Sequence, residues 1–250
     1  PKTNQMKNYP PVGEAEGKAA RVEQMFDAIA PRYDLLNRVL SLGIDQRWRT
    51  QAIRLLEDDR PRRVLDVATG TADLAIKAER LLHPREVVGV DLSEEMLRVG
   101  REKLARRGLH PRITLERADA AALPFPDGDF DAALVAFGVR NFEDLDAGLR
   151  EIARVLRPGG ALVVLEFSHP RAFPIKQLYA FYSRHVLPRI GRALSRDEGA
   201  YRYLPDSVAA FPDGPDFLAR VEAAGYRDLV WKPLTFGIAS LYKGYVAKGE

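Results

Sequence analysis

Five short apolar runs alternate with amphipathic helical patterns between residues 61 and 168, and this alternation restricts the fold more than any other feature. The runs are rich in Val, Leu and Ala, as expected of strands buried on both faces. Strands are predicted at 63–67, 86–91, 112–116, 130–136 and 161–167, and helices at 73–82, after Ser93 and at 143–156, the last ending at Pro158-Gly159-Gly160. Strands that alternate with helices at this spacing predict an α/β fold with a parallel sheet covered on both faces.

The segments on either side of this core predict additions to one α/β domain, and the length of 250 residues suits that size. Apolar runs at 229–231 and 236–246 are predicted to extend one edge of the sheet. The predicted divisions are a helical lid at 1–60, the core at 61–168, a basic amphipathic helical cap at 169–210, and a C-terminal helix with edge strands at 211–250.

Composition excludes several classes of site and protein. The chain has no cysteine, which excludes disulfides, thiolate zinc sites and cysteine nucleophiles. The four histidines, at 83, 110, 169 and 185, show no ligand spacing, so no metal site is predicted. No apolar run approaches the eighteen or so residues that a membrane span needs. A net charge of +3 is too small to indicate a nucleic-acid binder by itself. We therefore expect a cytoplasmic protein.

The turn after the first predicted strand is a candidate ligand site, because ligands of such sheets bind beyond the carboxyl ends of the strands. Its candidate residues are Asp66, Ala68, Gly70 and Thr71. Gly70 allows the backbone to approach a ligand closely, and the amides around Thr71 open a helix and can donate hydrogen bonds. The alternative is an ordinary strand-to-helix turn without a ligand.

Acidic residues follow the second and third predicted strands. Asp91 stands twenty-one residues after Gly70, where a carboxylate can accept hydrogen bonds from both ribose hydroxyls, with Leu92 beside it. Asp119 can accept from an adenine amino group, and the amide of Ala120 can meet a ring nitrogen. The alternative for Asp91 is a solvated acid in a turn.

The pattern of glycines indicates which nucleoside fits. A dinucleotide site needs G-x-G-x-x-G, whereas this turn has one glycine, and no phosphate-binding G-x-x-x-x-G-K-[ST] occurs. An adenosine ligand without phosphate therefore fits best, and S-adenosylmethionine is the obvious one.

Three further segments carry a more specific resemblance. They are residues 33–43, closed by Trp48, residues 137–141, and residues 154–168. With the nucleoside motifs they make the chain, from about residue 18 to 247, resemble the ubiquinone and menaquinone biosynthesis C-methyltransferases. The resemblance implies a class I S-adenosylmethionine-dependent methyltransferase fold: a Rossmann-like, mostly parallel seven-stranded sheet with an antiparallel edge, N-terminal helices and a helical cap.

The resemblance also implies site residues. It places cofactor contacts at Thr71, Asp91, Asp119 and Ala120. The chain departs from the family at three positions: it has Ala72 where members often have Gly, Ala136 where some have a cofactor-contacting Ser, and Asp45 where many have His. We assign no catalysis to Asp45.

The implied reaction is C-methylation of demethylmenaquinol, a polyprenylated hydroquinone, to menaquinol. A ring carbon becomes nucleophilic when the adjacent hydroxyl loses its proton, so the protein must stabilise a phenolate. Arg140 is the candidate for that task, and Asn141 for orienting the hydroxyl; a structural ion pair is the alternative for Arg140. Tyr33 is a further catalytic candidate, with a packing tyrosine as the alternative, and His169 a candidate base.

Residues 171–196 hold six Arg or Lys and no acid, with aromatic residues between them. This pattern predicts a basic amphipathic helix that contacts an anionic membrane, at the inner face of the cell membrane. The alternative is a cap helix that packs its apolar face on the domain. RNA is another polyanion, but no Asn-Pro-Pro-Tyr motif is present and we expect no nucleic acid. The sequence leaves the oligomeric state open.

Three competing functions remain at this point. The same chemistry on a polyprenyl-methoxy-benzoquinol, in ubiquinone biosynthesis, fits the motifs equally well. The fold also serves methyltransferases of other small molecules or RNA. A non-catalytic protein that holds S-adenosylmethionine is the third.

Overall fold

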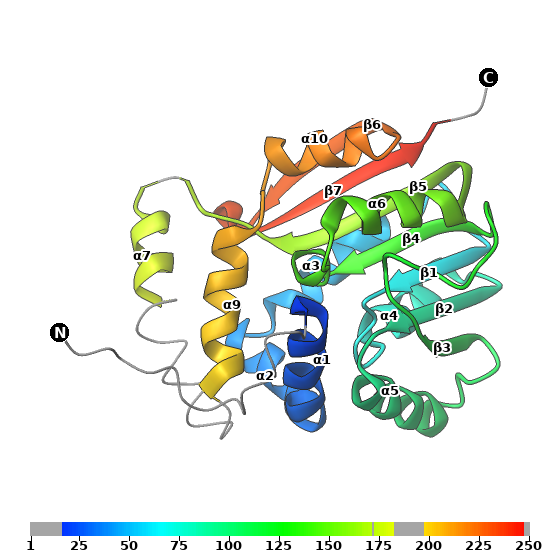
Figure 1. Ribbon diagram of the computed structural model, residues 1–250, viewed down its shortest axis with the longest axis horizontal. Coiled ribbons are helices and arrows are strands. Elements are labelled where there is room, and N and C mark those ends of the chain that lie inside the picture. The colour runs from blue at the N-terminus through cyan, green and yellow to red at the C-terminus, as the bar shows by residue number, and fades with distance from the viewer. Residues whose placement is uncertain (1–16, 172, 183–197, 248–250) are drawn as a thin grey trace.

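The computed structural model describes residues 17–171, 173–182 and 198–247. A seven-stranded sheet of order β3-β2-β1-β4-β5-β7-β6 forms its centre (Figure 1). The strands are β1 (Arg63–Val67), β2 (Glu86–Asp91), β3 (Ile113–Arg117), β4 (Phe130–Ala136), β5 (Leu156–Phe167), β6 (Tyr226–Leu234) and β7 (Ala239–Val246). The first five are parallel, whereas β7 runs antiparallel to β5 and β6. The expected mostly parallel sheet with an antiparallel edge is confirmed.

Helices cover both faces of the sheet. The helices are α1 (Lys18–Ile29), α2 (Tyr33–Leu40), α3 (Ile44–Arg54), α4 (Asp73–Leu82), α5 (Glu94–Arg107), α6 (Leu145–Val155), α7 (Ile175–Phe181), α9 (Glu198–Ala210) and α10 (Pro215–Ala223), with short 3-10 turns η1 (Ala30–Arg32), η2 (Val139–Asn141) and η4 (Thr235–Gly237). Alternate strand residues point to opposite faces. Val64 packs with α3, α4 and α5, while Leu65 packs with α6 and α10.

Several predicted boundaries were wrong by a few residues. The third strand is shifted by one residue, and the late strands begin at Tyr226 and Ala239. The helix predicted at 143–156 ends at Val155, because Leu156 already has extended backbone and pairs with Phe130 of β4. The chain then passes through Pro158-Gly159-Gly160 within β5, and the register shift between Phe130 and Ala132 absorbs the irregularity. Between the pairs at Phe130 and Ala132, β4 advances two residues and β5 five, an interruption of the register that a period-two pattern does not reveal.

The N-terminal helices and the cap helices gather on one side of the core. Figure 1 shows α1, α2, α7 and α9 on the same side of the sheet, and α1 also packs against α5, where Ile29 meets Met96. Residues 183–196, most of the segment predicted to contact a membrane, lie outside the described residues. This side of the molecule is where the parallel strands end, and it holds the cavities described below.

The centre of the sheet leaves no room for a side chain at Gly89 of β2. A Cβ there would lie 2.7 Å from Leu115 Cδ2 and 2.8 Å from Thr69 Oγ1. We expect Gly89→Ala to lower the free energy of unfolding by about 1–3 kcal/mol through overpacking, measured by urea denaturation. Leu115→Val removes the nearest methyl group, so the double variant should recover part of the loss. Unchanged stability in the single variant would contradict this packing.

Candidate active site

The turn between β1 and α4 is tight. Ala68, Gly70 and Ala72 all have positive φ, between 54° and 65°. The hydroxyl of Thr69 donates to Asp66 Oδ2 at 2.6 Å and ties the turn to the end of β1. This conformation is left-handed, which glycine adopts freely and alanine with strain, so the turn is held by its surroundings.

Asp66 lies beneath this turn rather than in the wall of a cavity described below. It is almost fully buried, and its Oδ1 accepts no hydrogen bond of normal geometry from the described residues. Burial raises the pKa of Asp66 to about 7, although the hydroxyl of Thr69 and the charge of Arg49 oppose the rise. The unpartnered oxygen leaves hydrogen-bonding capacity directly under the candidate ligand site.

Asp91 stands at the end of β2 and faces the same turn. Its carboxylate accepts hydrogen bonds from the amides of Gly70 at 2.8 Å and Ser93 at 2.9 Å. Burial raises the pKa of Asp91 to about 6, while these backbone hydrogen bonds favour the charged form. The carboxylate is therefore positioned rigidly, with further acceptor capacity for a ligand.

A small cavity of about 70 Å³ brings the ends of β1, β2 and β3 together. Six of the eight predicted cofactor residues line it: Ala68, Gly70, Asp91, Leu92, Asp119 and Ala120. Asp119 is exposed and orders its own turn by accepting from the amide of Ala121 at 2.9 Å. Thr71 lines a narrow extension of about 20 Å³ on the other side of Gly70. We call the small cavity and this extension the cofactor cavity.

A much larger cavity of about 570 Å³ lies next to the cofactor cavity. We call it the large cavity. Most of its wall is apolar or aromatic, contributed by α1, α2, α3, α7 and α9. Tyr33, Phe26 and Phe137 line both the large and the small cavity, and Asn37, Asp45 and Arg49 line both the large cavity and the extension. These side chains mark the junction. A volume of this size holds a small organic molecule.

Arg140 lies in the wall of the large cavity and forms a buried ion pair. Its Nη1 donates to Glu166 Oε1 at 2.8 Å, and its Nε donates to Ser207 at 3.3 Å. Glu166 is 0% exposed, and burial raises its pKa while the charge of Arg140 opposes the rise. The ion pair considered as an alternative for Arg140 therefore exists, together with its access to the cavity.

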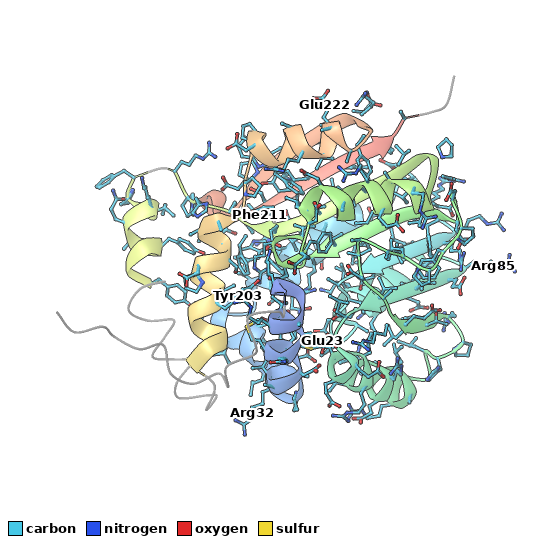
Figure 2. The ribbon with its side chains drawn as sticks, viewed as in Figure 1. Glu23, Arg32, Arg85, Tyr203, Phe211 and Glu222 are labelled. Carbon is cyan, nitrogen blue, oxygen red and sulfur yellow. The ribbon has the colours of Figure 1, made fainter. Side chains whose placement is uncertain are left out.

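Asn141 lies on the other side of the junction from Arg140. It lines the cofactor cavity, and its Oδ1 accepts a hydrogen bond from the hydroxyl of Tyr203 at 2.9 Å. Figure 2 shows Tyr203 on α9, the cap helix. The structure thus separates two residues that are adjacent in sequence and assigns one to each cavity.

Tyr33 and His169 have different surroundings. Tyr33 is at the junction, and burial raises the pKa of its hydroxyl against the opposing charge of Arg49. It therefore remains a neutral hydrogen-bond donor near pH 7. His169 is 43% exposed in its side chain, lies 3.4 Å from Asp213, and does not line the large cavity. The structure gives no support to His169 as the base.

The helices α1 and α2, which the sequence predicts to serve as a lid, are joined to the strand ends by polar contacts. Lys18 donates to the carbonyl of Phe142 at 2.7 Å after β4, and Glu23, labelled in Figure 2, pairs with Arg117 at 2.6 Å on β3. After β2, the hydroxyl of Ser93 donates to Asp27 at 2.5 Å. After β1, the hydroxyl of Thr71 donates to Asp34 at 2.5 Å, and Lys103 pairs with the same carboxylate at 2.6 Å. The lid therefore touches the end of each strand that borders the cofactor cavity.

Two kinds of feature are absent from the described residues. No group of three or more metal-ligating side chains lies together among them. Within the same residues, no helix combines the length and the apolar character that crossing a membrane requires.

Comparison with known proteins identifies relatives along nearly the whole chain. The model of the ubiE/COQ5 methyltransferase family matches residues 14–246. A demethylmenaquinone methyltransferase from Bacteroides fragilis is 49% identical over 94% of this chain and 98% of its own length. One from Deinococcus radiodurans is 48% identical, covering 95% and 97%. A ubiquinone/menaquinone biosynthesis C-methyltransferase from Geobacter sulfurreducens is 49% identical, covering 91% and 89%.

Solved structures share the fold at low sequence identity. A methyltransferase from Thermotoga maritima that depends on S-adenosylmethionine is 19% identical, with a TM-score of 0.61 over 89% of this chain and 98% of its own. The [4+2]-cyclase SpnF is also 19% identical, with a TM-score of 0.67 over 93% and 97%. A cyclase among these neighbours shows that the fold alone does not determine the reaction.

Proposed function

The chain belongs to the ubiE/COQ5 methyltransferase family, and from this premise we propose that it methylates a ring carbon of demethylmenaquinol, giving menaquinol, with S-adenosylmethionine as the methyl donor. The observation that carries the proposal is the meeting of two cavities at Tyr33 and Phe137. One cavity presents the carboxylates of Asp91 and Asp119 at the strand ends and suits a nucleoside, and the other is large and apolar and suits a prenylated ring.

The residues of the cofactor cavity fit the methyl donor. The carboxylate of Asp91, at the end of β2, would accept hydrogen bonds from the ribose hydroxyls. Asp119 and Ala120, after β3, would contact the adenine. When bound, S-adenosylmethionine supplies an electrophilic methyl group on a sulfonium. The backbone of Ala68–Gly70 leaves room beside β1 for the rest of the molecule.

The large cavity would hold the acceptor ring and exclude water from it. Methyl transfer breaks the sulfur–carbon bond, whose electron pair stays on sulfur, and forms a carbon–carbon bond, after which the ring loses a proton. The guanidinium of Arg140 is placed to stabilise the phenolate that makes the ring carbon nucleophilic. Tyr33 can donate a hydrogen bond at the junction, and Asn141, held by Tyr203, can orient groups from the cofactor side.

A ubiquinone precursor is the second candidate acceptor. The relative from Geobacter sulfurreducens carries the name of both pathways at the same identity as the menaquinone-specific one. The methoxy-benzoquinol ring is smaller than the naphthoquinol ring, and the apolar wall accepts either.

The proposal is tested by transfer of labelled methyl from S-adenosylmethionine to chemically reduced demethylmenaquinone, with the reduced ubiquinone precursor and both oxidised quinones in parallel. We expect transfer to the naphthoquinol and none to the oxidised quinones, because these cannot form a phenolate. Transfer to both quinols would make this a dual-pathway enzyme. Cofactor binding without transfer to either quinol would refute the proposed acceptor.

We further propose that the mouth of the large cavity contacts the membrane that holds the prenyl tail. Leu42 is 90% exposed and Phe236 74% exposed, and both line this cavity, as does the exposed Leu178. Large apolar side chains at a cavity mouth are unusual on a soluble surface. They would insert among lipid tails, with the exposed basic residues Arg171 and Lys176 near the headgroups. This contact would place the protein at the inner face of the cell membrane.

We expect Leu42→Glu with Phe236→Glu to weaken co-sedimentation with phosphatidylglycerol vesicles at least about tenfold, because two apolar side chains lose their burial in lipid. The matched control is Val230→Glu, which changes a side chain that is 51% exposed on β6, away from the cavity. Equal binding of the double variant and the control would contradict membrane contact at this mouth.

A further inference from the structure

Arg49 on α3 is a buried cation with few hydrogen bonds to the protein, although the carboxylates of Asp45 and Asp66 lie near its charge. It is 7% exposed, and its one hydrogen bond to a described residue joins Nε to Asp45 Oδ2 at 3.5 Å. The carboxylate of Asp45 is shared, since it also accepts from Ser41 at 2.7 Å and Gln46 at 3.0 Å. A buried charge normally has close, well-formed partners, so this guanidinium has donors left for an anion.

The free side of Arg49 faces the place where the two cavities meet. Arg49 lines the large cavity and also the narrow extension of the cofactor cavity. The extension is also lined by the turn after β1, from Ala68 to Thr71, and by Ala136 at the end of β4. Three carboxylates, of Asp34, Asp45 and Asp73, belong to its polar lining, and Arg49 is the one arginine among the described residues there. The carbon Cζ of Arg49 lies 5.3 Å from the centre of the Phe137 ring, a cation–π contact that keeps the guanidinium near the junction.

The order of the strands indicates which part of a nucleoside ligand reaches this extension. The sheet runs β3-β2-β1-β4. With the adenine beyond β3 and the ribose held by Asp91 beyond β2, the rest of the molecule continues past Gly70 towards β1 and β4. The methionyl end of S-adenosylmethionine therefore enters the extension, and this end carries a carboxylate.

We propose that Arg49 binds the α-carboxylate of the methionyl group of S-adenosylmethionine. The planar guanidinium offers two parallel donors to the two oxygens of a carboxylate, which is the geometry of the strongest charge-assisted hydrogen bonds. The inference rests on binding of the methyl donor and is independent of the acceptor. The other candidate anion is the phenolate of the acceptor, but Arg140 already lines the large cavity, and Arg49 shares the extension with the turn after β1.

Two ligands, one with the α-carboxylate and one without it, distinguish binding of this group from binding of the rest of the molecule. S-adenosylhomocysteine carries the carboxylate, and its decarboxylated analogue keeps the adenosine, thioether and amine. By calorimetry at pH 7.5, we expect Arg49→Met to raise the Kd of S-adenosylhomocysteine about tenfold to a hundredfold, which is the effect of losing hydrogen bonds to a charged group. Affinity for the decarboxylated analogue should stay the same. Arg49→Lys keeps the positive charge but lacks the two parallel donors of the guanidinium, so its loss of affinity for S-adenosylhomocysteine should be intermediate.

The matched control is Lys77→Met. Lys77 is a half-buried cation near Arg49 that donates to the carbonyl of Gln46 at 2.8 Å and lines neither cavity. The Lys77→Met variant should retain the wild-type preference for S-adenosylhomocysteine over its decarboxylated analogue. Equal weakening of both nucleosides in both Arg49 variants would show a structural role and overturn the proposal. Unchanged binding with slower methyl transfer would also overturn it and assign Arg49 to the acceptor. Failure of the wild type to bind S-adenosylhomocysteine would instead refute the cofactor site itself.

Discussion

Arg140→Met is expected to lower kcat for methyl transfer by about a hundredfold to a thousandfold, while the Kd of S-adenosylhomocysteine changes little. The reason is that removal of one preorganised charge or donor at a developing oxyanion has an effect of that size. Arg140 lines the large cavity, whereas the predicted ribose and adenine contacts lie in the cofactor cavity. The measurement is the rate of labelled methyl transfer to reduced demethylmenaquinone at saturating cofactor.

The ion pair with Glu166 requires a control, because Glu166 is fully buried. Removing one partner of a buried pair destabilises a protein by about 3–5 kcal/mol. Arg140→Met with Glu166→Gln removes both charges and should restore much of the stability without restoring turnover. Near-normal turnover in this folded double variant would reduce Arg140 to a structural role.

Asp91→Asn should weaken S-adenosylhomocysteine binding about tenfold to a hundredfold, because hydrogen bonds to a charged group contribute about 1.5–3 kcal/mol. The substitution keeps the shape of the side chain but replaces the charged acceptor that we propose for the two ribose hydroxyls with a neutral amide. Asp119→Asn is the comparison variant, since Asp119 is exposed and its loss should matter less.

The same residue predicts a pH dependence. The pKa of Asp91 is raised to about 6, so the carboxylate forms as pH rises through 6. Ligand affinity of the wild type should therefore increase from pH 5 to pH 7 and then level off. The stability of the free protein should respond with the opposite sign, because a raised carboxyl pKa favours the protonated native state and this contribution is lost as pH rises from the ordinary carboxyl range through 6. An identical pH profile of binding in Asp91→Asn would contradict the assignment.

The parts of the site that the sequence predicted are those fixed by strand order. Asp91 and Asp119 each follow an apolar run, and parallel strands end at one edge of the sheet. Both residues were therefore expected at the same edge, and both line the small cavity there. Glu166 could not be assigned in this way. Its pairing with Arg140 joins residues twenty-six apart through the neighbouring strands β4 and β5, and only its place after an apolar run hinted at the site.

Arg49 and the lid contacts were missed for a related reason. A charged residue inside a helical pattern usually indicates a solvated face, and the burial of Arg49 and Lys103 depends on how helices pack. The end of α6 shows that tertiary contacts also determine where backbone elements begin and end. Pro158-Gly159-Gly160 predicts a break, but tertiary pairing with β4 extends β5 back to Leu156.

The most direct test of this account is a crystal structure of the protein with S-adenosylhomocysteine and a demethylmenaquinone analogue. The account predicts the ribose on Asp91, the sulfur at the junction between Tyr33 and Phe137, and the quinone ring in the large cavity. The acceptor carbon should then lie about 3–4 Å from the sulfur-bound position of the methyl group, the separation from which transfer proceeds. A ring bound outside the large cavity, or an adenosine bound away from Asp91, would contradict it.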